Sequence, residues 1–220
     1  MIFSRETPAV IIEALSVRFG ERAIISDFSL ILPVGKHVVI EGESGSGKST
    51  ILKCILGFVV PEKGQILIGG EELNRENVWA LRRKIGFVQQ EAEFKQGSVL
   101  EILKRPFAFK ANRGDEFSET AVKELFDKFK LSERLLKEDI QSLSGGEKQR
   151  VAIISALLMR RPIYLMDEVT SALDDESKEC ILDYFKEQKG LTILSVAHDK
   201  VYNSFADRVI QLDSNRGDAQ

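Results

Sequence analysis

A glycine-rich segment that ends in a lysine is the part of this chain best suited to chemistry. Residues 42–49 read G-E-S-G-S-G-K-S and follow the apolar run 38–40. Glycines let the backbone turn with positive φ, so successive N–H groups can point at one phosphate, and the positive end of a following helix adds to the attraction. In this pattern the lysine reaches the β and γ oxygens of a nucleotide, and the next hydroxyl binds Mg²⁺. The segment therefore predicts a nucleotide-binding loop, formed by Gly42, Glu43, Ser44, Gly45, Ser46, Gly47, Lys48, Ser49 and Thr50.

The context of this loop argues against a Gly/Ser-rich surface loop that contains a lysine by chance. An apolar strand pattern precedes it, and a run with helical spacing follows, made of Ile51, Leu52, Ile55 and Leu56 and stopped by Gly57. Strand, loop and helix in this order are the arrangement in which a phosphate-binding loop works.

A pair of carboxylates, Asp167 and Glu168, follows the apolar run 163–166. This pattern predicts a buried strand that delivers both carboxylates at its carboxyl end. A hydrolase has to orient a water in line with the γ-phosphate, and an adjacent carboxylate can polarise that water or accept its proton. Taken alone, the pair is also typical of a solvated strand end. The phosphate loop upstream favours hydrolysis of a nucleotide.

Residues 143–150, which read L-S-G-G-E-K-Q-R, form an unusually polar start to a helix-like segment. In order and spacing, this segment, the phosphate loop and the Asp–Glu pair resemble the nucleotide-binding subunit of the ABC (ATP-binding cassette) ATPases. The resemblance covers about residues 11–212. It implies an α/β fold, namely a P-loop NTPase with a mixed, mainly parallel core sheet, an N-terminal antiparallel β subdomain and an inserted helical subdomain. It also implies ATP and Mg²⁺ as cofactors, and ATP hydrolysis coupled to transmembrane transport.

The resemblance assigns roles around one bound nucleotide. Asp167 matches the Walker B aspartate, which holds Mg²⁺ together with Ser49 and the glutamine of the Q-loop. Glu168 matches the catalytic carboxylate. His198 follows the strand-like run 191–196 and matches the switch histidine, which contacts the γ-phosphate.

The Q-loop glutamine and the adenine-stacking aromatic are matched less uniquely. Gln90 ends the run I-G-F-V-Q-Q and matches the glutamine that touches Mg²⁺ and the water; Gln89 beside it leaves the register open, although the family spacing favours Gln90. Phe19 matches the aromatic that stacks on adenine, a position where a packing residue is also common. The implied catalytic set is Lys48, Gln90, Glu168 and His198.

Two further matches concern a second subunit. The family signature supplies serine and glycine amides at a helix N-terminus, which contact the γ-phosphate bound by the partner. In this chain the signature comprises Ser144, Gly145, Gly146 and Glu147. Residues 171–174 match the D-loop at the dimer contact, and Asp174 is counted among the nucleotide-binding residues. The resemblance thus implies a homodimer, or a heterodimer with another ATP-binding subunit, and a separate transmembrane permease.

Some positions depart from the family pattern. Val169 stands where a proline commonly follows the catalytic glutamate, and Ser155 stands where an arginine is common; both predict a change of packing only. Residues 137–142 lack the pattern seen in many fused exporters. The motifs are most similar to those of small stand-alone cassettes from metal or iron export systems, which makes a metal ion the expected cargo.

The elements between the motifs must hold these residues in place. Strand patterns at 10–32 and 65–68 flank the phosphate loop, and residues 91–142 are dominated by helical spacing. A helix is expected at 175–189, because acidic residues begin it and Gly190 follows it. We expect a single ABC ATPase domain over 1–220, with the nucleotide-binding core and β subdomain at 10–90 and 160–212, a helical subdomain at 91–159 and a disordered tail at 213–220.

Three phenylalanines in the helical segment allow two interpretations. Phe94, Phe107 and Phe109 could receive a helix of the permease, or they could fill the core of the subdomain. Three other residues stand outside the motifs. Cys54 and Cys180 lack metal-binding spacing and are expected as buried or half-buried thiols in a reducing compartment, and His37 is expected as a structural or surface residue.

Composition and hydropathy limit the classes of protein and the cellular location that we expect. Thirty-one basic and 34 acidic residues give a net charge of −3, which disfavours a protein built to grip nucleic acid. No apolar run approaches the roughly 18 residues that span a bilayer, and residues 1–6 do not resemble a signal peptide. We therefore expect a cytoplasmic protein, held at the inner face of the membrane by a permease encoded separately.

Two alternatives to transport remain. A soluble ABC ATPase that acts on ribosomes or DNA usually has two cassettes or a long insertion, for which residues 91–142 leave no room. A cassette that regulates a membrane or cell-wall complex without pumping keeps the same site, so the sequence does not separate it from a transporter.

Overall fold

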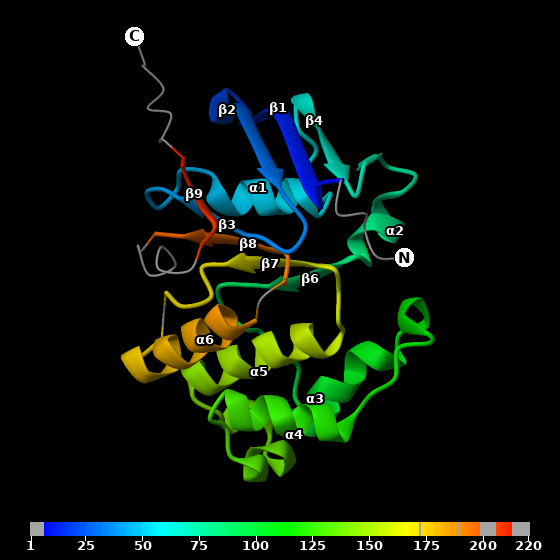
Figure 1. Ribbon diagram of the computed structural model, residues 1–220, viewed down its shortest axis with the longest axis vertical. Helices are drawn as coiled ribbons and strands as arrows, with labels where there is room; N and C mark the ends of the chain where they lie inside the picture. Colours follow the sequence, from blue (N-terminus) through cyan, green and yellow to red (C-terminus); the bar gives the residue numbers. More distant parts are fainter. Residues whose placement is uncertain (1–6, 172, 189, 199–205, 213–220) are drawn as a thin grey trace. The chain divides into compact units, whose positions relative to one another are not determined.

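The computed structural model describes residues 7–171, 173–188, 190–198 and 206–212. The expectations for residues 1–6, Ala172, Lys189 and the tail at 213–220 fall outside these ranges. The chain divides into two compact units (Figure 1). The first contains Met1–Ile85, Pro162–Glu168 and Gly190–Gln220, and the second contains Gly86–Arg161 and Val169–Lys189. The phosphate loop and the Asp–Glu pair belong to the first unit, and the signature belongs to the second.

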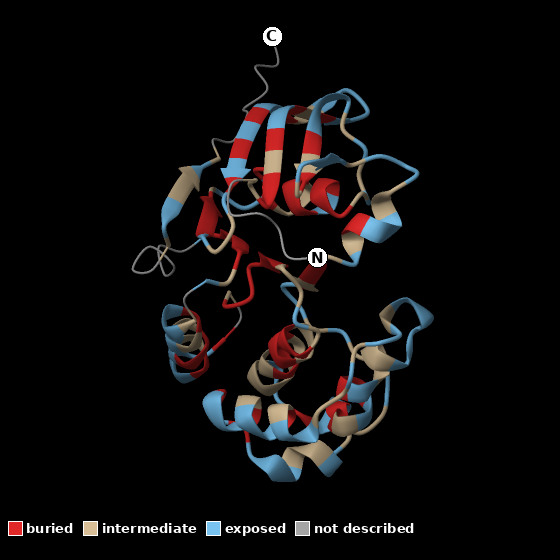
Figure 2. Cartoon of the chain, turned by 45° about the vertical axis from the view of Figure 1, so that its right-hand side comes forward, coloured by how far each residue is buried: buried red, intermediate tan, exposed pale blue. Residues whose placement is uncertain are grey.

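The first unit contains an antiparallel sheet with the strand order β2-β1-β4-β5. Its strands are β1 (Val10–Phe19), β2 (Arg22–Leu32), β4 (Lys63–Ile68) and β5 (Glu71–Glu72). Ile12 pairs with Leu30 on one side and with Ile66 on the other, and all three are buried. Buried and exposed residues alternate along the second half of β2 (Figure 2), as in a sheet with one covered face. This sheet confirms the predicted N-terminal antiparallel β subdomain.

A parallel sheet forms the core of the same unit. Side by side lie β7 (Ile163–Asp167), β8 (Ile193–Ala197), β3 (His37–Glu41) and β9 (Arg208–Gln211). Every residue of β3, β7 and β8 is buried, as expected for apolar strands covered on both faces. Because the carboxyl ends of parallel strands meet at one edge of a sheet, the residues that follow these three strands are brought together there. The predicted mainly parallel core sheet is confirmed.

The remaining elements of the first unit are short. Helix α1 (Lys48–Ile55) follows the phosphate loop and ends just before Gly57, whose φ is 68°. Helix α2 (Val78–Arg82) precedes β6 (Ile85–Val88). Ile85 is the last residue of the range Met1–Ile85, so the chain passes along β6 from the first unit into the second.

Apart from the end of β6, the regular elements described in the second unit are helices. Its α-helices are α3 (Val99–Lys104), α4 (Glu119–Lys128), α5 (Gly145–Leu158) and α6 (Asp175–Glu187). Four short 3-10 helices connect them, at Arg105–Ala108, Lys110–Asn112, Glu133–Lys137 and Ile140–Ser142. An oxygen-bearing side chain caps the start of each α-helix by accepting a hydrogen bond from a backbone N–H group; the caps are Ser98, Ser118, Ser144 and Asp174. In the described part of the chain, no helix has the length and apolar character to cross a bilayer.

The phenylalanines of the helical segment are only partly covered. Phe94 and Phe107 are half-buried, and Phe109 is 58% exposed. Phe107 packs edge-on against Phe117, with ring centroids 5.3 Å apart. The core of this unit is instead built around the fully buried Phe126 and Phe129. Phe109 is therefore not a core residue.

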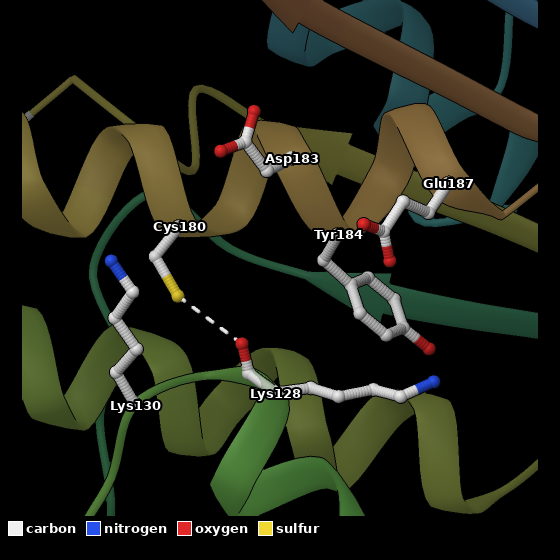
Figure 3. A pocket seen from close by; sticks show the side chains of 6 residues that line it. All are labelled: Lys128, Lys130, Cys180, Asp183, Tyr184 and Glu187. Atoms are coloured by element: carbon white, nitrogen blue, oxygen red, sulfur yellow. Dashed lines mark hydrogen bonds between the residues drawn. The ribbon is translucent and has the colours of Figure 1, made fainter.

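Both cysteines are buried free thiols. Burial raises the pKa of Cys54 to about 11 and also raises the pKa of Cys180. The Sγ of Cys180 donates to the carbonyl oxygen of Lys128 at 3.4 Å, on the wall of a cavity of about 230 Å³ in the second unit (Figure 3). The cavity is also lined by Lys130, Asp183, Tyr184 and Glu187. Because both thiols stay protonated at neutral pH, neither is prepared for thiolate chemistry.

His37 is a structural residue at the start of β3. It is buried, and its Nε2 lies 2.9 Å from the Oγ of Ser195. Burial lowers the pKa of His37 from 6.5 to about 4, against the opposing attraction of Asp207. The imidazole is therefore neutral at pH 7.

Acidification is expected to destabilise the fold through His37. Its pKa is about 4 in the folded chain and about 6.5 in the unfolded chain, so between pH 7 and pH 5 only the unfolded chain gains the proton. The free energy of unfolding should therefore fall as the pH falls, and His37 should account for about 2 kcal/mol between these two pH values. Urea unfolding of the wild type and of His37→Gln, which cannot titrate, measures this share. Equal pH dependence in the two proteins would contradict the assignment.

Candidate functional site

The phosphate loop connects β3 to α1 in the first unit. Helix α1 begins at Lys48, and the residue before it, Gly47, has a φ of 101°. A Cβ atom at Gly47 would lie 3.1 Å from side-chain atoms of Ile24 and Ile25 and 3.2 Å from the carbonyl oxygen of Ile24. Both the backbone conformation and the space therefore require glycine at this position.

The ammonium group of Lys48 lies inside this loop. Its Nζ donates to the carbonyl oxygens of Gly42 and Glu43, each at 2.9 Å, and lies 3.3 Å from the Oε1 of Glu168. The lysine is only 3% exposed. A buried cation surrounded by carbonyl oxygens and one carboxylate is a ready partner for the oxygens of a phosphate chain.

Two oxygen atoms converge next to the lysine. The Oγ of Ser49 donates to the Oδ1 of Asp167 at 2.7 Å. Burial raises the pKa of Asp167, while the hydrogen bond from Ser49 opposes the shift. A hydroxyl and a carboxylate oxygen in contact are the hard donors that Mg²⁺ prefers, so this donor set fits the ion.

Glu168 occupies the centre of the candidate site. Its Oε1 faces Lys48, and its Oε2 lies 3.1 Å from the Nε2 of His198. The backbone of Glu168 has a φ of 46°, a left-handed conformation that costs a residue with a side chain about 1 kcal/mol or more. The N–H of Glu168 donates to the carbonyl oxygen of Val196 at 3.0 Å and holds this turn against β8. The strain directs one carboxylate between a cation and an imidazole.

Phe19 lies at the end of β1 and is 55% exposed. Its ring is thus available at the surface and is not part of the core. A contact between this ring and adenine stays a prediction.

The signature lies at the start of α5 in the second unit. Ser144 and Glu147 form a capping box: the Oγ of Ser144 accepts from the N–H of Glu147 at 3.3 Å, and the Oε2 of Glu147 accepts from the N–H of Ser144 at 2.8 Å. Ser144 and Gly145 are exposed. The first turn of α5 is therefore capped, and its first residues are exposed to solvent.

The two glutamines of the Q-loop have different contacts within the second unit. The Nε2 of Gln90 donates to the Oγ of Ser171, the first residue of the D-loop, at 3.3 Å. The backbone carbonyl oxygen of Gln89 accepts from the Nε2 of Gln149 at 2.8 Å. These contacts do not involve a nucleotide or an ion, so Gln90 as the Q-loop glutamine stays a prediction.

Sequence reasoning assigned no role to three polar residues that the structure places beside the motifs. Gln149 is 3% exposed, and Arg150 and Ser177 join the signature helix to the start of α6. The sequence carries only a weak indication of a role for Gln149: this polar residue occupies a buried position of α5, where an apolar residue is usual.

The fold and the first unit's site define a class of protein. A glycine-rich loop with a buried lysine, facing two carboxylates at the carboxyl edge of a parallel sheet, is the site of a P-loop nucleotide hydrolase. The chain belongs to the ABC transporter family, whose model matches residues 25–171. It is an ATP-binding subunit of this family and an ATPase.

Individual relatives match over most of this chain. The "Probable iron export ATP-binding protein FetA" of Escherichia coli (strain K12) is 30% identical, over 97% of this chain and 95% of that protein. The "Methionine import ATP-binding protein MetN" of Mesorhizobium japonicum is 38% identical over 92% of this chain, which spans 57% of that relative. Among solved structures, the dimeric post-hydrolysis state of the ATP-binding cassette MJ0796 bound to ADP and Pi has a TM-score of 0.81 at 31% identity, covering 94% of this chain and 97% of that chain.

Proposed function

We propose that this chain dimerises around two ATP molecules and that their hydrolysis drives a separate transmembrane permease. The observation that carries the proposal is the arrangement Lys48–Glu168–His198 at the edge of the parallel sheet. The ABC family and the dimeric MJ0796 structure support the dimer. Relatives named for iron export and for methionine import share this cassette, so cargo selection belongs to the permease.

Three side chains of the first unit have distinct roles in the proposed reaction. Lys48 binds the β and γ oxygens of ATP and offsets the negative charge that develops on the phosphate oxygens in the transition state. Glu168 polarises the attacking water and accepts its proton. His198 holds the second oxygen of Glu168 and contacts the γ-phosphate, which fixes the direction of the carboxylate.

Mg²⁺ is the proposed companion of ATP. Ser49 and Asp167 would hold the ion, with Gln90 as a further contact, and the ion would neutralise charge on the phosphate oxygens. The remaining loop residues 42–47 and Thr50 supply backbone amides and hydroxyls to the phosphates.

The second unit supplies the proposed partner contacts. The exposed amides at Ser144 and Gly145 would bind the γ-phosphate held by the other subunit. The D-loop residue Asp174 would lie at the same dimer contact. In this arrangement neither subunit completes a site alone.

The proposed association with a permease is tested by purifying this protein from the source cells. Tagged Glu168→Gln protein, which should hold ATP without turnover, is purified with ATP and Mg²⁺ from detergent-solubilised membranes, and its companions are identified by mass spectrometry. We expect a multi-span membrane protein with about two cassettes per permease unit. A tagged Lys48→Ala/Glu168→Gln protein serves as the matched control with weakened ATP binding. Recovery of ribosomal, DNA-repair or cell-wall proteins in place of a membrane protein would contradict the proposal.

A further inference from the structure

A polar network joins α5 to α6 within the second unit. Asp174 caps α6: its Oδ1 accepts from the N–H of Ser177 at 2.8 Å, and its Oδ2 accepts from the Oγ of Ser177 at 2.8 Å. The same Oγ accepts a short hydrogen bond from the Nη1 of Arg150 on α5. One hydroxyl therefore connects the D-loop carboxylate to the guanidinium of the signature helix.

The hydroxyl of Ser177 is not needed to cap α6. The cap uses the backbone N–H of residue 177, which any residue except proline provides. The side chain of Ser177 is instead committed to Arg150 and Asp174, at a position only 2% exposed. Both hydrogen bonds involve a charged partner, and such bonds are stronger than those between neutral groups.

Arg150 depends on this contact. Its Nε is buried and makes no hydrogen bond among the described residues. The Arg150 side chain is long and lies half-buried between two helices, and the hydrogen bond from its Nη1 to Ser177 holds its guanidinium in place. Loss of the hydroxyl would leave a partly buried guanidinium without this acceptor, which is costly.

The network also touches the signature directly. A Cβ atom at Gly146 would lie 3.0 Å from the Oγ of Ser177 and 3.3 Å from the Oδ2 of Asp174. Gly146 has an ordinary helical backbone, so the need for glycine here is one of space. The first turn of α5, named here the signature turn (Ser144–Glu147), thus rests against the hydroxyl of Ser177.

We propose that Ser177 is a positioning residue that holds the signature turn and the D-loop residue Asp174 in one fixed arrangement, through its shared hydrogen bonds with Arg150. The inference rests on the proposed function, in which both elements face the ATP of the partner subunit. Ser177 touches neither the nucleotide nor the reacting atoms. Its loss should therefore impair engagement of the partner's ATP and leave binding at the chain's own phosphate loop unchanged.

The first measurement is ATP-driven dimerisation in the Glu168→Gln background. Sedimentation with ATP and Mg²⁺ gives the dimer dissociation constant with and without Ser177→Ala. We expect the substitution to weaken the dimer about tenfold or more, because one or two charge-assisted hydrogen bonds are lost. ATP affinity of the monomer, measured by calorimetry without Mg²⁺, should change less than about twofold, since the phosphate loop lies in the other unit.

The control is Ser118→Ala, which removes a serine hydroxyl that caps α4 in the same unit. It should lower thermal stability without weakening the dimer. Ser177→Cys, which is close to serine in size but a poor acceptor, repeats the test if Ser177→Ala does not fold. In a double-mutant cycle on the melting temperature, Ser177→Ala should add little once Arg150 is replaced by Met.

The outcomes separate the two proposals. If the Glu168→Gln parent does not dimerise with ATP, the proposed function fails and this inference fails with it. If the parent dimerises, and the Ser177 variant that folds dimerises as tightly as the parent, the inference alone is overturned. A weaker dimer with unchanged monomer affinity supports it.

Discussion

Replacing Glu168 by glutamine is expected to lower the rate of ATP hydrolysis by about 100-fold or more, while ATP affinity changes by less than about threefold. Glutamine keeps the size of the side chain and can still meet Lys48 and His198, but its amide accepts no proton from water. General-base assistance typically contributes 10²–10⁴-fold to a rate, which sets the expected loss. The phosphate contacts lie on other residues, so binding should survive.

Steady-state phosphate release measures the rate, and calorimetry measures the affinity. Glu62→Gln, which makes the same chemical change at an exposed carboxylate of the same unit, is the matched control and should hydrolyse ATP like the wild type. Retention of near-normal turnover by Glu168→Gln would remove Glu168 from the role of general base. The slow variant should also accumulate as a dimer on ATP and Mg²⁺, because the bound nucleotide is not consumed.

The parts of the site that lie close together in sequence could be predicted. The phosphate loop is one continuous segment between a strand pattern and a helix pattern, and the structure shows β3, the loop and α1 in that order. The Asp–Glu pair was expected at the end of a buried strand, and β7 ends at Asp167. Local patterns were sufficient here because hydrophobic periodicity sets each element separately.

Contacts between distant segments do not follow from local patterns; only the family resemblance placed Lys48 and Glu168 at the same nucleotide. The pair formed by Lys48 and Glu168 joins α1 to the end of β7, and a single sequence gives no measure of that approach. The left-handed backbone of Glu168 also has no local signal, because a residue with a side chain adopts it only when surrounding contacts require it. Strain of this kind is set by tertiary structure.

The same limit explains the residues that sequence reasoning missed. Arg150 is part of the polar helix start at 143–150, and no role was assigned to Ser177 from the sequence. Their contact forms only because two helices of the second unit meet at this point. His37 shows the complementary case: it is buried on β3, which lies between β8 and β9 in the parallel sheet, and no local pattern around a single histidine reveals this position.

Replacing Lys48 by alanine is expected to weaken ATP binding by about 10- to 100-fold and to abolish measurable hydrolysis. The ammonium group is buried, and two loop carbonyl oxygens and the carboxylate of Glu168 hold it at the position where phosphate oxygens must bind. Charge-assisted hydrogen bonds of this type contribute about 1.5–3 kcal/mol each, which corresponds to the expected loss of affinity. Alanine offers no donor and leaves Glu168 without its cation.

Lys53→Ala is the matched control for this prediction, because Lys53 lies on the same helix α1 but is exposed. It should bind and hydrolyse ATP like the wild type. Calorimetric titration with ATP gives both affinities, and urea unfolding shows whether Lys48→Ala remains folded. A folded Lys48→Ala protein that binds ATP as tightly as Lys53→Ala would show that the loop holds phosphate through its backbone amides alone. In that case the buried ammonium would act on the transition state only, and the loss would appear in kcat and not in affinity.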